Sequence, residues 1–524
     1  MAIVLGLDIG TSSTKGLLLG TDGEIRATAS AAYPLLRPQP GWSEQDPEEW
    51  WTACERVVRE LLGAARVAPG DVRGIGLSGQ MHGSVFLDAA GVSRVREGGR
   101  AAAALRPAIL WNDQRTGEEC AEIERLVGGP RALVELVGNR ALTGLTLPKI
   151  LWLRRHEPHV FRRTAKVLLP KDYIRLRMTG ESITDVGDAS GYLLLEPESR
   201  AWSGRVLRAV DLDPALLPTI VESGAPAGRL TPWAASRLHL EPDLPVAAGS
   251  GDNMTGALGA GIVQEGVVLA ALGTSGVIYA HSDSPRRDLP ADPGVPVGRL
   301  QSMCAADGGV RAPGHWCLTG CMLSAGGSLH WCREALFPNE SYDRLLAEAA
   351  EVPAGSDGLV FLPYLTGERC PHPDPHARGG WIGLTSRHTR GHLVRAVLEG
   401  VTFGMSQMLD LVRDVGVPVH AVRIGSGGAR SPLWRQLQAD VYGCPVALLR
   451  TEEGSALGAA MLGGVASGMW PDAAAACRAV VHETDRIEPD RERHELLLRA
   501  RAVYARLHGD LGPANQILSA REQA

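Results

Sequence analysis

Leu-Asp-Ile-Gly-Thr-Ser-Ser-Thr-Lys, residues 7–15, stands between two apolar runs near the start of the chain. This pattern predicts a strand, a tight turn and a second strand. Leu-Gly-Thr-Ser-Gly, residues 272–276, repeats the pattern with apolar runs on both sides. Because such a turn presents backbone N–H groups and hydroxyls, it can hold a phosphate group without a helix. One copy in each half of the chain predicts a two-lobed nucleotide clamp.

Composition limits the classes of partner. The 524 residues favour two domains, and the net charge of −6 argues against nucleic acid or an anionic membrane as a partner. The longest apolar stretch, at 267–280, is too short to span a bilayer. Nine cysteines at no framework spacing suit a reducing compartment, and the chain runs directly into its first strand. We therefore expect a cytoplasmic protein without a signal peptide.

Two lobes are expected along the chain. We assign residues 1–245 to an N-terminal lobe and residues 246–524 to a C-terminal lobe that carries Asp252. A stretch rich in proline and glycine, residues 222–245, is the expected passage between them. Residues 47–62 predict a helix with Asp46 as N-cap, and residues 486–509 predict a charged amphipathic helix.

Two aspartates are candidates for chemistry. Asp252 follows a short strand and Gly249-Ser250-Gly251, where a carboxylate meets a ligand in a cleft and accepts the proton of an attacking hydroxyl. Its structural alternative is an N-cap for the helix that follows. Asp8 ends the first strand, where it could hold Mg²⁺ beside bound phosphates. Its alternative is a turn aspartate that bonds its own backbone, but the second turn favours the nucleotide interpretation.

A glycine-rich turn at 424–431 predicts a place for a purine. Gly427 and Gly428 would let the backbone approach a flat ring closely, and Ser431 is the expected cap of the following helix. The P-loop pattern is absent from the sequence, and no G-x-G-x-x-G follows the first strand. P-loop and Rossmann folds are therefore disfavoured.

Four further residues could face a sugar. Met81 and His82 lie in a loop after a short buried strand, where His82 could hydrogen-bond a polyol hydroxyl. A buried structural histidine is the alternative. Trp111 and Trp42 could stack on a sugar face, although an isolated tryptophan more often belongs to a core.

A local group of histidines and cysteines comprises His315, Cys317, Cys321, His330 and Cys332. Its spacing matches no common zinc site, so we interpret the cysteines as small buried side chains.

Two longer motifs indicate the family. Gly-Leu-Thr-Leu-Pro-Lys-Ile-Leu-Trp-Leu-Arg-Arg-His occupies residues 144–156, and residues 379–399 run from Gly-Gly-Trp-Ile-Gly-Leu to His-Leu-Val-Arg-Ala-Val-Leu-Glu. With these motifs the chain resembles the FGGY carbohydrate kinases over nearly its whole length. The loop Gly-Leu-Ser-Gly-Gln-Met-His-Gly at 76–83 is similar to the sugar loop of the branch that acts on ketopentoses.

The resemblance implies an α/β fold of the two-lobed, actin-like ATPase (ribonuclease H-like) type with an active-site cleft between the lobes. It implies Asp252 as catalytic base and Asp8 as a second catalytic residue near the metal. At the sugar we expect Met81, His82, Trp111, Asp252 and Asn253. At the nucleotide we expect Gly10, Thr11, Ser12, Thr14, Lys15, Gly273, Thr274, Gly427, Gly428 and Ser431.

The implied reaction moves the γ-phosphate of ATP, with Mg²⁺, onto a primary hydroxyl of a ketopentose to give its 5-phosphate. Two alternatives stay open: a kinase for another polyol, ketose or sugar acid, and a catalytically silent sugar sensor. A chaperone-type ATPase is disfavoured because no peptide-binding module follows the second lobe. The expected partners are a sugar and ATP, and a homodimer is compatible with this interpretation.

Overall fold

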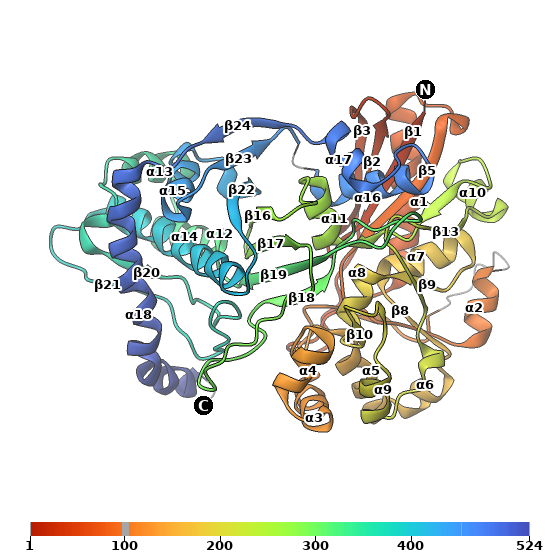
Figure 1. Cartoon of the computed structure of the whole chain (residues 1–524), viewed down its shortest axis with the longest axis horizontal. Helices are drawn as coiled ribbons and strands as arrows, with labels where there is room; N and C mark the ends of the chain where they lie inside the picture. Colours follow the sequence, from red (N-terminus) through yellow and green to blue (C-terminus); the bar gives the residue numbers. More distant parts are fainter. Residues whose placement is uncertain (1, 97–103, 452, 523–524) are drawn as a thin grey trace.

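The computed structural model describes residues 2–96, 104–451 and 453–522. Figure 1 shows two lobes side by side, and each is built around one large sheet. Helices cover the sheets, so the α/β class predicted from the sequence is confirmed.

The N-terminal sheet has the strand order β13-β14-β5-β1-β2-β3, and β15 also pairs with β5. Its central pairs are β1 with β2, antiparallel, and β1 with β5, parallel. The strands are β1 (Ile3–Ile9), β2 (Ser13–Gly20), β3 (Ile25–Ala32), β5 (Val72–Gly79), β13 (Pro226–Arg229), β14 (Pro245–Ala247) and β15 (Ser250–Gly251).

The C-terminal sheet repeats this plan. Its order is β18-β19-β17-β16-β22-β23-β24, with β16 antiparallel to β17 and parallel to β22. The strands are β16 (Gly266–Leu272), β17 (Gly276–Ser282), β18 (Gln301–Cys304), β19 (Trp316–Met322), β22 (Val419–Gly425), β23 (Val446–Leu449) and β24 (Glu483–Ile487). Each half of the chain thus contributes a hairpin followed by a parallel strand.

Both predicted hairpins are confirmed. The first closes where the Gly10 N–H donates to Ser13 O at 3.1 Å, and the second where the Gly273 N–H donates to Ser275 O at 3.0 Å. The sequence pattern therefore located both turns correctly.

Helices of the N-terminal lobe begin with α1 (Pro47–Ala65), which packs on β2 and β3. Asp46 caps α1 as predicted, since its Oδ1 accepts the Glu48 N–H at 3.0 Å. The other helices are α2 (Ala89–Arg96), α3 (Gly117–Val127), α4 (Pro130–Val137), α5 (Thr146–His156), α6 (Pro158–Arg163), α7 (Pro170–Thr179), α8 (Val186–Ala189), α9 (Gly204–Ala209) and α10 (Pro232–Leu238), with 3₁₀ turns at Pro69–Asp71, Ser190–Tyr192 and Pro214–Leu216.

Short strand pairs complete that lobe. They join β4 (Glu44–Gln45) to β7 (Ala108–Ile109), β6 (Val85–Leu87) to β8 (Lys166–Leu168), β9 (Ile183–Asp185) to β12 (Thr219–Val221), and β10 (Leu195–Glu196) to β11 (Ala201–Trp202).

The C-terminal lobe packs around α14 (Arg390–Asp414), whose buried side chains form much of its core. Other elements there are α12 (Gly326–Leu336), α13 (Tyr342–Ala350), α15 (Pro432–Tyr442), α18 (Arg491–Glu522), the strands β20 (Val360–Leu362) and β21 (Gly380–Ile382), and 3₁₀ turns at Ser356–Gly358 and Gly427–Ala429. The predicted terminal helix starts later than expected, because residues 483–487 form the edge strand β24 and pair with β23.

Two helices lie between the sheets. α11 (Asp252–Gly259) packs against α16 (Gly454–Ala466), and α16 packs on β1 and β5, while α17 (Ala473–Val480) follows it. The approach is close enough to require glycine: a Cβ at Gly6 would lie 2.2 Å from Ala456 O, and one at Gly76 would lie 1.7 Å from Ala459 O. A helix from the C-terminal half of the chain, α16, therefore packs on the first sheet.

The predicted lobe boundary between residues 245 and 246 needs correction. β14 and β15 extend to Gly251 and pair with β5, so this part of the chain belongs to the first sheet. α11, with Asp252, packs against α16 and so belongs to the same lobe. The passage expected at 222–245 is instead β13 and α10, because β13 pairs with β14 at the edge of the first sheet.

Candidate active site

Asp252 stands at the first turn of α11, directly after β15. β15 pairs in parallel with the end of β5, which brings Ser250 opposite Ser78. Gly251 is the N-cap of α11 and Asp252 is half-buried, so the N-cap alternative for Asp252 is not what the fold adopts. The Asp252 carboxylate is consequently available to the cleft.

Asp8 lies near the end of β1, opposite Ser78 of β5 and Lys15 of β2. Ser78 Oγ donates to Asp8 Oδ1 at 2.9 Å and lies 2.7 Å from Thr255 Oγ1 of α11. One buried serine thus joins the strand of Asp8 to the helix of Asp252. Ser78 is not among the site residues predicted from the sequence. Its position near the end of β5, where strands reach the site, was the signal that could have identified it.

Both carboxyl groups have raised pKa values. Burial is the main cause for Asp252, whose pKa rises to about 7, and the negative charge of Asp8 adds to it. Burial also raises the pKa of Asp8 to about 6, against the opposing effects of the Ser78 hydrogen bond and Lys15. A carboxylate with a pKa near neutrality is a stronger base than an ordinary aspartate, which suits proton acceptance from a hydroxyl.

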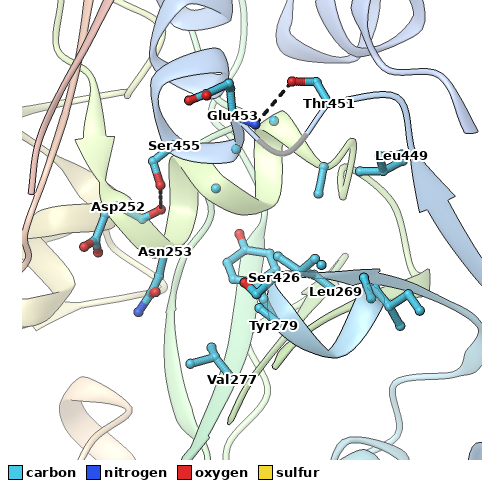
Figure 2. A pocket seen from close by; sticks show the side chains of 18 of the residues that line it. Asp252, Asn253, Leu269, Val277, Tyr279, Ser426, Leu449, Thr451, Glu453 and Ser455 are labelled. Carbon is cyan, nitrogen blue, oxygen red and sulfur yellow. Dashed lines mark hydrogen bonds between the residues drawn. The ribbon is translucent and has the colours of Figure 1, made fainter. Parts of the chain in front are cut away.

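A cavity of about 500 Å³ opens beside these carboxylates. Figure 2 shows Asp252 and Asn253 on one side of it, with Tyr279 and Ser426 of the other lobe across the space. Asp8 and Lys15 also line it. The cavity therefore lies between the lobes and unites four predicted site residues.

The first turn is braced from several sides. Gln45 Nε2 donates to Thr11 O at 2.6 Å, and Trp111 Nε1 donates to Thr11 Oγ1 at 2.9 Å. Ser12 is exposed, and Gly10 and Thr11 are partly exposed. Thr14 is a correction: it is fully buried, because alternation along β2 turns its side chain inward while Lys15 faces out. Its hydroxyl does not face the cleft.

A second cavity of about 860 Å³ lies in the C-terminal lobe. Its volume is that of a site for a drug-sized ligand. It unites all five residues predicted for the nucleotide there, namely Gly273, Thr274, Gly427, Gly428 and Ser431. Arg430 lines both cavities, so the two spaces adjoin.

Glycines around this second cavity have distinct roles. A Cβ at Gly427 would meet Leu272 O at 3.6 Å, an ordinary contact, so this position is open. A Cβ at Gly428 would lie 2.5 Å from the Leu272 Cβ, which makes glycine necessary for packing. Gly326, which sequence reasoning missed, donates its N–H to Gly273 O at 2.8 Å and supports the second turn. Ser431 caps α15 as predicted.

The loop predicted to face the sugar follows β5. Met81 is buried, and His82 is half-buried with φ of 67°, in the left-handed region. Lys149 Nζ donates to His82 O at 2.8 Å and to Gly144 O at 2.6 Å. The long motif at 144–156 thus holds the loop backbone in its unusual conformation through a buried lysine, a role that the sequence alone did not reveal.

Burial and nearby positive charges keep the imidazole of His82 neutral. Burial is the largest cause and Lys149 and Arg369 add to it, so the pKa of His82 falls to about 3. Burial also lowers the pKa of Lys149 to about 7. A neutral imidazole has one donor and one acceptor nitrogen, which suits hydrogen bonding to a sugar hydroxyl.

The two tryptophan candidates differ. Trp111 is 43% exposed and faces the first turn through its hydrogen bond to Thr11. Asn253, another residue predicted at the sugar, is exposed beside Asp252. Trp42 packs under Arg115, whose guanidinium carbon lies 3.5 Å from its ring centroid, and against Trp152. Trp42 is therefore a packing residue.

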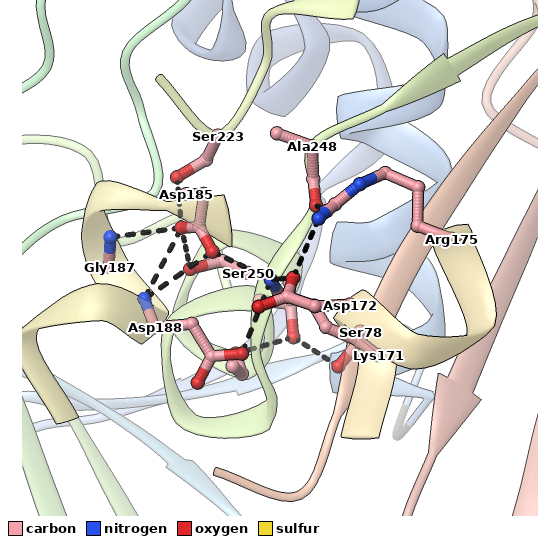
Figure 3. Close-up of polar contacts among 12 residues, drawn as sticks. Ser78, Lys171, Asp172, Arg175, Asp185, Gly187, Asp188, Ser223, Ala248 and Ser250 are labelled. Atoms are coloured by element: carbon pink, nitrogen blue, oxygen red, sulfur yellow. Dashed lines mark hydrogen bonds and ion pairs between the residues drawn. The ribbon is translucent and has the colours of Figure 1, made fainter. Parts of the chain in front are cut away.

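Beneath the cleft lies a fully buried ion cluster (Figure 3). Lys171 Nζ lies 2.6 Å from Asp172 Oδ1, 2.9 Å from Asp185 Oδ1 and 3.2 Å from Asp188 Oδ2. Burial raises the pKa of Asp188 well above its ordinary value, although Lys171 opposes this.

This cluster holds the chain that leads to Asp252. Ser250 Oγ donates to Asp185 Oδ2 at 2.7 Å, and Arg175 Nη1 donates to Ala248 O at 2.7 Å. Two buried side chains therefore fix the two residues that bracket Gly249. The sequence does carry one signal for this cluster: several charged residues occur in segments whose other residues are typical of a buried core.

The histidine–cysteine group is separated by the fold. Cys317 and Cys332 belong to different hydrophobic cores, and His330 lines the second cavity. His315 bonds instead to Asp307. Residues near in sequence are thus distributed over β19 and α12.

A duplicated hairpin-and-strand plan, a carboxylate cleft between the lobes and an adjoining nucleotide-sized cavity define a two-lobed phosphoryl-transfer enzyme. Comparison of sequences makes the assignment specific. The N-terminal domain of the FGGY family of carbohydrate kinases matches residues 3–259, and its C-terminal domain matches residues 268–467. The chain belongs to the FGGY family of carbohydrate kinases, which uses ATP as cosubstrate and a sugar as acceptor, and the predicted resemblance is confirmed.

Curated relatives agree over most of the chain. A xylulose kinase of Bacillus subtilis (strain 168) is 39% identical over 470 residues, covering 90% of this chain and 89% of its own length. A xylulose kinase of Escherichia coli (strain K12) is 39% identical over 511 residues, covering 97% of this chain and 99% of its own.

Solved structures confirm the actin-like fold of this family. A xyloylose kinase from Brucella ovis superposes with a TM-score of 0.87 at 34% identity, covering 98% of this chain and all of that one. A xylulose kinase from Rhodospirillum rubrum gives a TM-score of 0.87 at 33% identity with the same coverage. Every helix in the described parts of this chain is too short or too polar to cross a membrane.

Proposed function

We propose that this carbohydrate kinase transfers the γ-phosphoryl group of ATP to the primary hydroxyl of D-xylulose and forms D-xylulose 5-phosphate. The curated relatives named xylulose kinase, at 39% identity, support this sugar over others. The observation that carries the chemistry is the pair of half-buried carboxyl groups, Asp8 and Asp252, which Ser78 links through β1 and α11.

In this proposal Asp252 orients the attacking hydroxyl and accepts its proton. Phosphoryl transfer has a loose transition state, so alignment and charge neutralisation matter more than early proton removal. The Asp252 pKa of about 7 leaves enough of the base ionised near neutral pH while keeping it basic. Asn253 is placed next to it to contact the sugar.

Mg²⁺ would be held by Asp8. This fits the site, because one Asp8 oxygen accepts from Ser78 and the residue lines the cavity between the lobes. The ion would neutralise charge on the phosphates. Lys15, on the strand paired with β1, would add a positive charge at the same cleft.

The nucleotide would occupy the second cavity, with its phosphates directed toward the first. Gly427 is open enough for a purine to approach the backbone, and Gly273 and Thr274 line the same cavity at the turn between β16 and β17. Gly10, Thr11 and Ser12 would complete the phosphate site from the opposite lobe. Each lobe supplies one turn, so neither encloses the phosphates alone.

The sugar would bind at Met81, His82 and Trp111, beside Asp252. A neutral His82 can donate to one hydroxyl or accept from another, and the exposed face of Trp111 can stack on the carbon chain. These contacts suit a polyhydroxylated neutral ligand. A ketopentose has that character, whereas a sugar acid brings a carboxylate.

A sugar panel tests the proposal. The purified protein is assayed by ADP release with D-xylulose, L-xylulose, D-ribulose, L-ribulose, glycerol and D-gluconate, and the product is identified by NMR. We expect the highest kcat/KM with D-xylulose and phosphate on carbon 5. Asp252→Asn, purified identically, controls for a contaminating kinase. A higher kcat/KM with another acceptor would replace D-xylulose as the substrate, and binding without turnover would favour the sensor.

Two further features belong to the proposal. We place the enzyme in the cytoplasm, a reducing compartment, which fits its nine free cysteines. We also propose a homodimer, which light scattering at several protein concentrations would test: a constant mass of one chain contradicts it.

A further inference from the structure

Three potential metal ligands that line neither cavity converge at the end of β17 and on the loop between β18 and β19. His281 Nε2 lies 3.0 Å from Asp307 Oδ2, and His315 Nδ1 lies 2.6 Å from the same oxygen. The three ligand atoms all lie within 4.8 Å of one another. Of the histidines and cysteines that the sequence brings close together, this set includes His315 but no cysteine.

The three side chains are oriented by their surroundings. His281 is 1% exposed, which fixes its ring against the core. Asp307 Oδ1 accepts the His315 backbone N–H at 2.8 Å, so Oδ2 is left to face both imidazoles. The other ring nitrogen of His281, Nδ1, lies 3.6 Å from Asp283 Oδ1 and is buried without a hydrogen-bond partner. A carboxylate behind a histidine is the usual outer support of a metal ligand.

The charge of Asp307 suits a cation. Burial would raise the pKa of its carboxyl group, but hydrogen bonds from His281 and His315 outweigh burial and hold the pKa well below the ordinary value. The site therefore contains one carboxylate and two imidazoles whose nitrogens face it. A divalent ion would take the place of the two hydrogen-bond protons between these groups.

We propose that His281, Asp307 and His315 form a site for a divalent metal ion of the zinc class. Two imidazoles and one carboxylate suit Zn²⁺, and small rotations would bring the ligand atoms to the spacing of a tetrahedral ion. Mg²⁺ prefers oxygen ligands and does not compete for nitrogen donors. The site is thus independent of the Mg²⁺ expected at Asp8.

The ion would stabilise the loop on which the first lobe docks. Arg200 of the N-terminal lobe donates to His315 O at 2.9 Å and also to Gly314 O, and Glu222 accepts the Gly314 N–H at 3.2 Å. His281 is five residues along β17 from the turn at Gly276, about 16 Å at the usual rise per residue. The role is therefore structural rather than catalytic.

Metal titration tests the site. Full-length protein freed of metal with a chelator is titrated with Zn²⁺ by calorimetry, in excess Mg²⁺, and with Co²⁺ by visible absorption. We expect one equivalent of tight binding, a Co²⁺ band typical of low coordination number, and a higher Tm with Zn²⁺. His315→Ala and Asp307→Asn should each weaken binding at least ~100-fold, and Asp283→Ala about 10-fold.

His159→Ala is the matched control, since it removes an exposed histidine on α6. This variant should bind Zn²⁺ like the parent. His315 is 48% exposed at its side chain, so His315→Ala leaves the core intact, and circular dichroism verifies that each variant is folded. Absence of stoichiometric binding by the parent, or equal binding by His315→Ala and Asp307→Asn, would overturn the proposal and leave the three residues as a hydrogen-bonded group only.

Discussion

The raised pKa of Asp252 leads to a quantitative prediction about pH. With a pKa of about 7, Asp252 is about half ionised at pH 7, roughly one tenth at pH 6 and roughly one hundredth at pH 5. A base must be ionised to accept a proton, so kcat/KM for the sugar should fall about tenfold per pH unit below this value. An ordinary aspartate would stay ionised throughout the range. Burial of Asp252, the main cause of its raised pKa, should therefore produce a fall in kcat/KM on the acid side of the pH profile.

The contacts of Asp252 also predict how its pKa should change when a neighbouring charge is removed. The negative charge of Asp8 contributes to the Asp252 shift, so neutralising Asp8 should lower the Asp252 pKa. In metal-free protein, ¹³C NMR of labelled aspartate should show a titration near pH 7 that is absent in Asp252→Asn and moves to lower pH in Asp8→Asn. Mg²⁺ bound at Asp8 should act in the same direction.

The same substitution tests the role in catalysis. Asp252→Asn keeps the size of the side chain but removes the proton acceptor, so kcat should fall at least ~100-fold while sugar binding, measured by calorimetry, is retained. The stability of this variant provides the control. Because the folded pKa of Asp252 is raised, its ionisation costs stability as the pH increases from about 4 through 7, and the asparagine variant should be the more stable protein at pH 8. Near-normal turnover, or a flat pH profile in the parent, would refute the assignment.

Four other changes separate the roles of the site. Asp8→Ala should raise the Mg²⁺ concentration needed for half-maximal rate about tenfold or more without weakening sugar binding; an unchanged Mg²⁺ dependence would make Asp8 a turn residue. His82→Ala should raise the sugar KM at least ~10-fold and leave the ATP KM unchanged, and the reverse result would put this loop at the nucleotide. Gly427→Val should do the opposite, since its side chain would enter the second cavity. Lys171→Met should destabilise the protein by about 3–5 kcal/mol in urea unfolding, because three buried aspartates lose their shared cation, and a smaller loss would mean that they are protonated together.

Features that depend on a few neighbouring residues could be predicted from the sequence. The two hairpins, the Asp46 and Ser431 caps and the strand-end position of Asp8 follow from short runs of sequence, and each of these is found in the structure. Asp252 was recognised for the same reason, since a glycine-rich turn separates its strand from its helix. The candidate site was therefore visible wherever its residues are neighbours in the chain.

Contacts between distant segments were not visible in this way. Ser78 and Thr255 are 177 positions apart, and their hydroxyls meet only because β5 and α11 pack together. The inward position of Thr14 depends on which face of β2 the core covers, a choice that the turn sequence does not contain. The support of the His82 backbone by Lys149 likewise depends on the placing of α5 against the loop.

The placing of α11 shows how the two lobes divide the reaction. A Cβ at Gly458 would lie 1.9 Å from Thr255 O, and one at Gly259 would lie 2.1 Å from Gly454 O, so α11 and α16 are in backbone contact. Since α16 is packed equally closely on β1 and β5, Asp252 moves with the lobe that carries Asp8 and the sugar loop. The cavity proposed for the nucleotide lies in the other lobe. In the proposed reaction, motion between the lobes would therefore change the distance from phosphate to sugar while Asp252 stays with the sugar hydroxyl. The phosphoryl group would meet an oriented acceptor only when the cleft is closed.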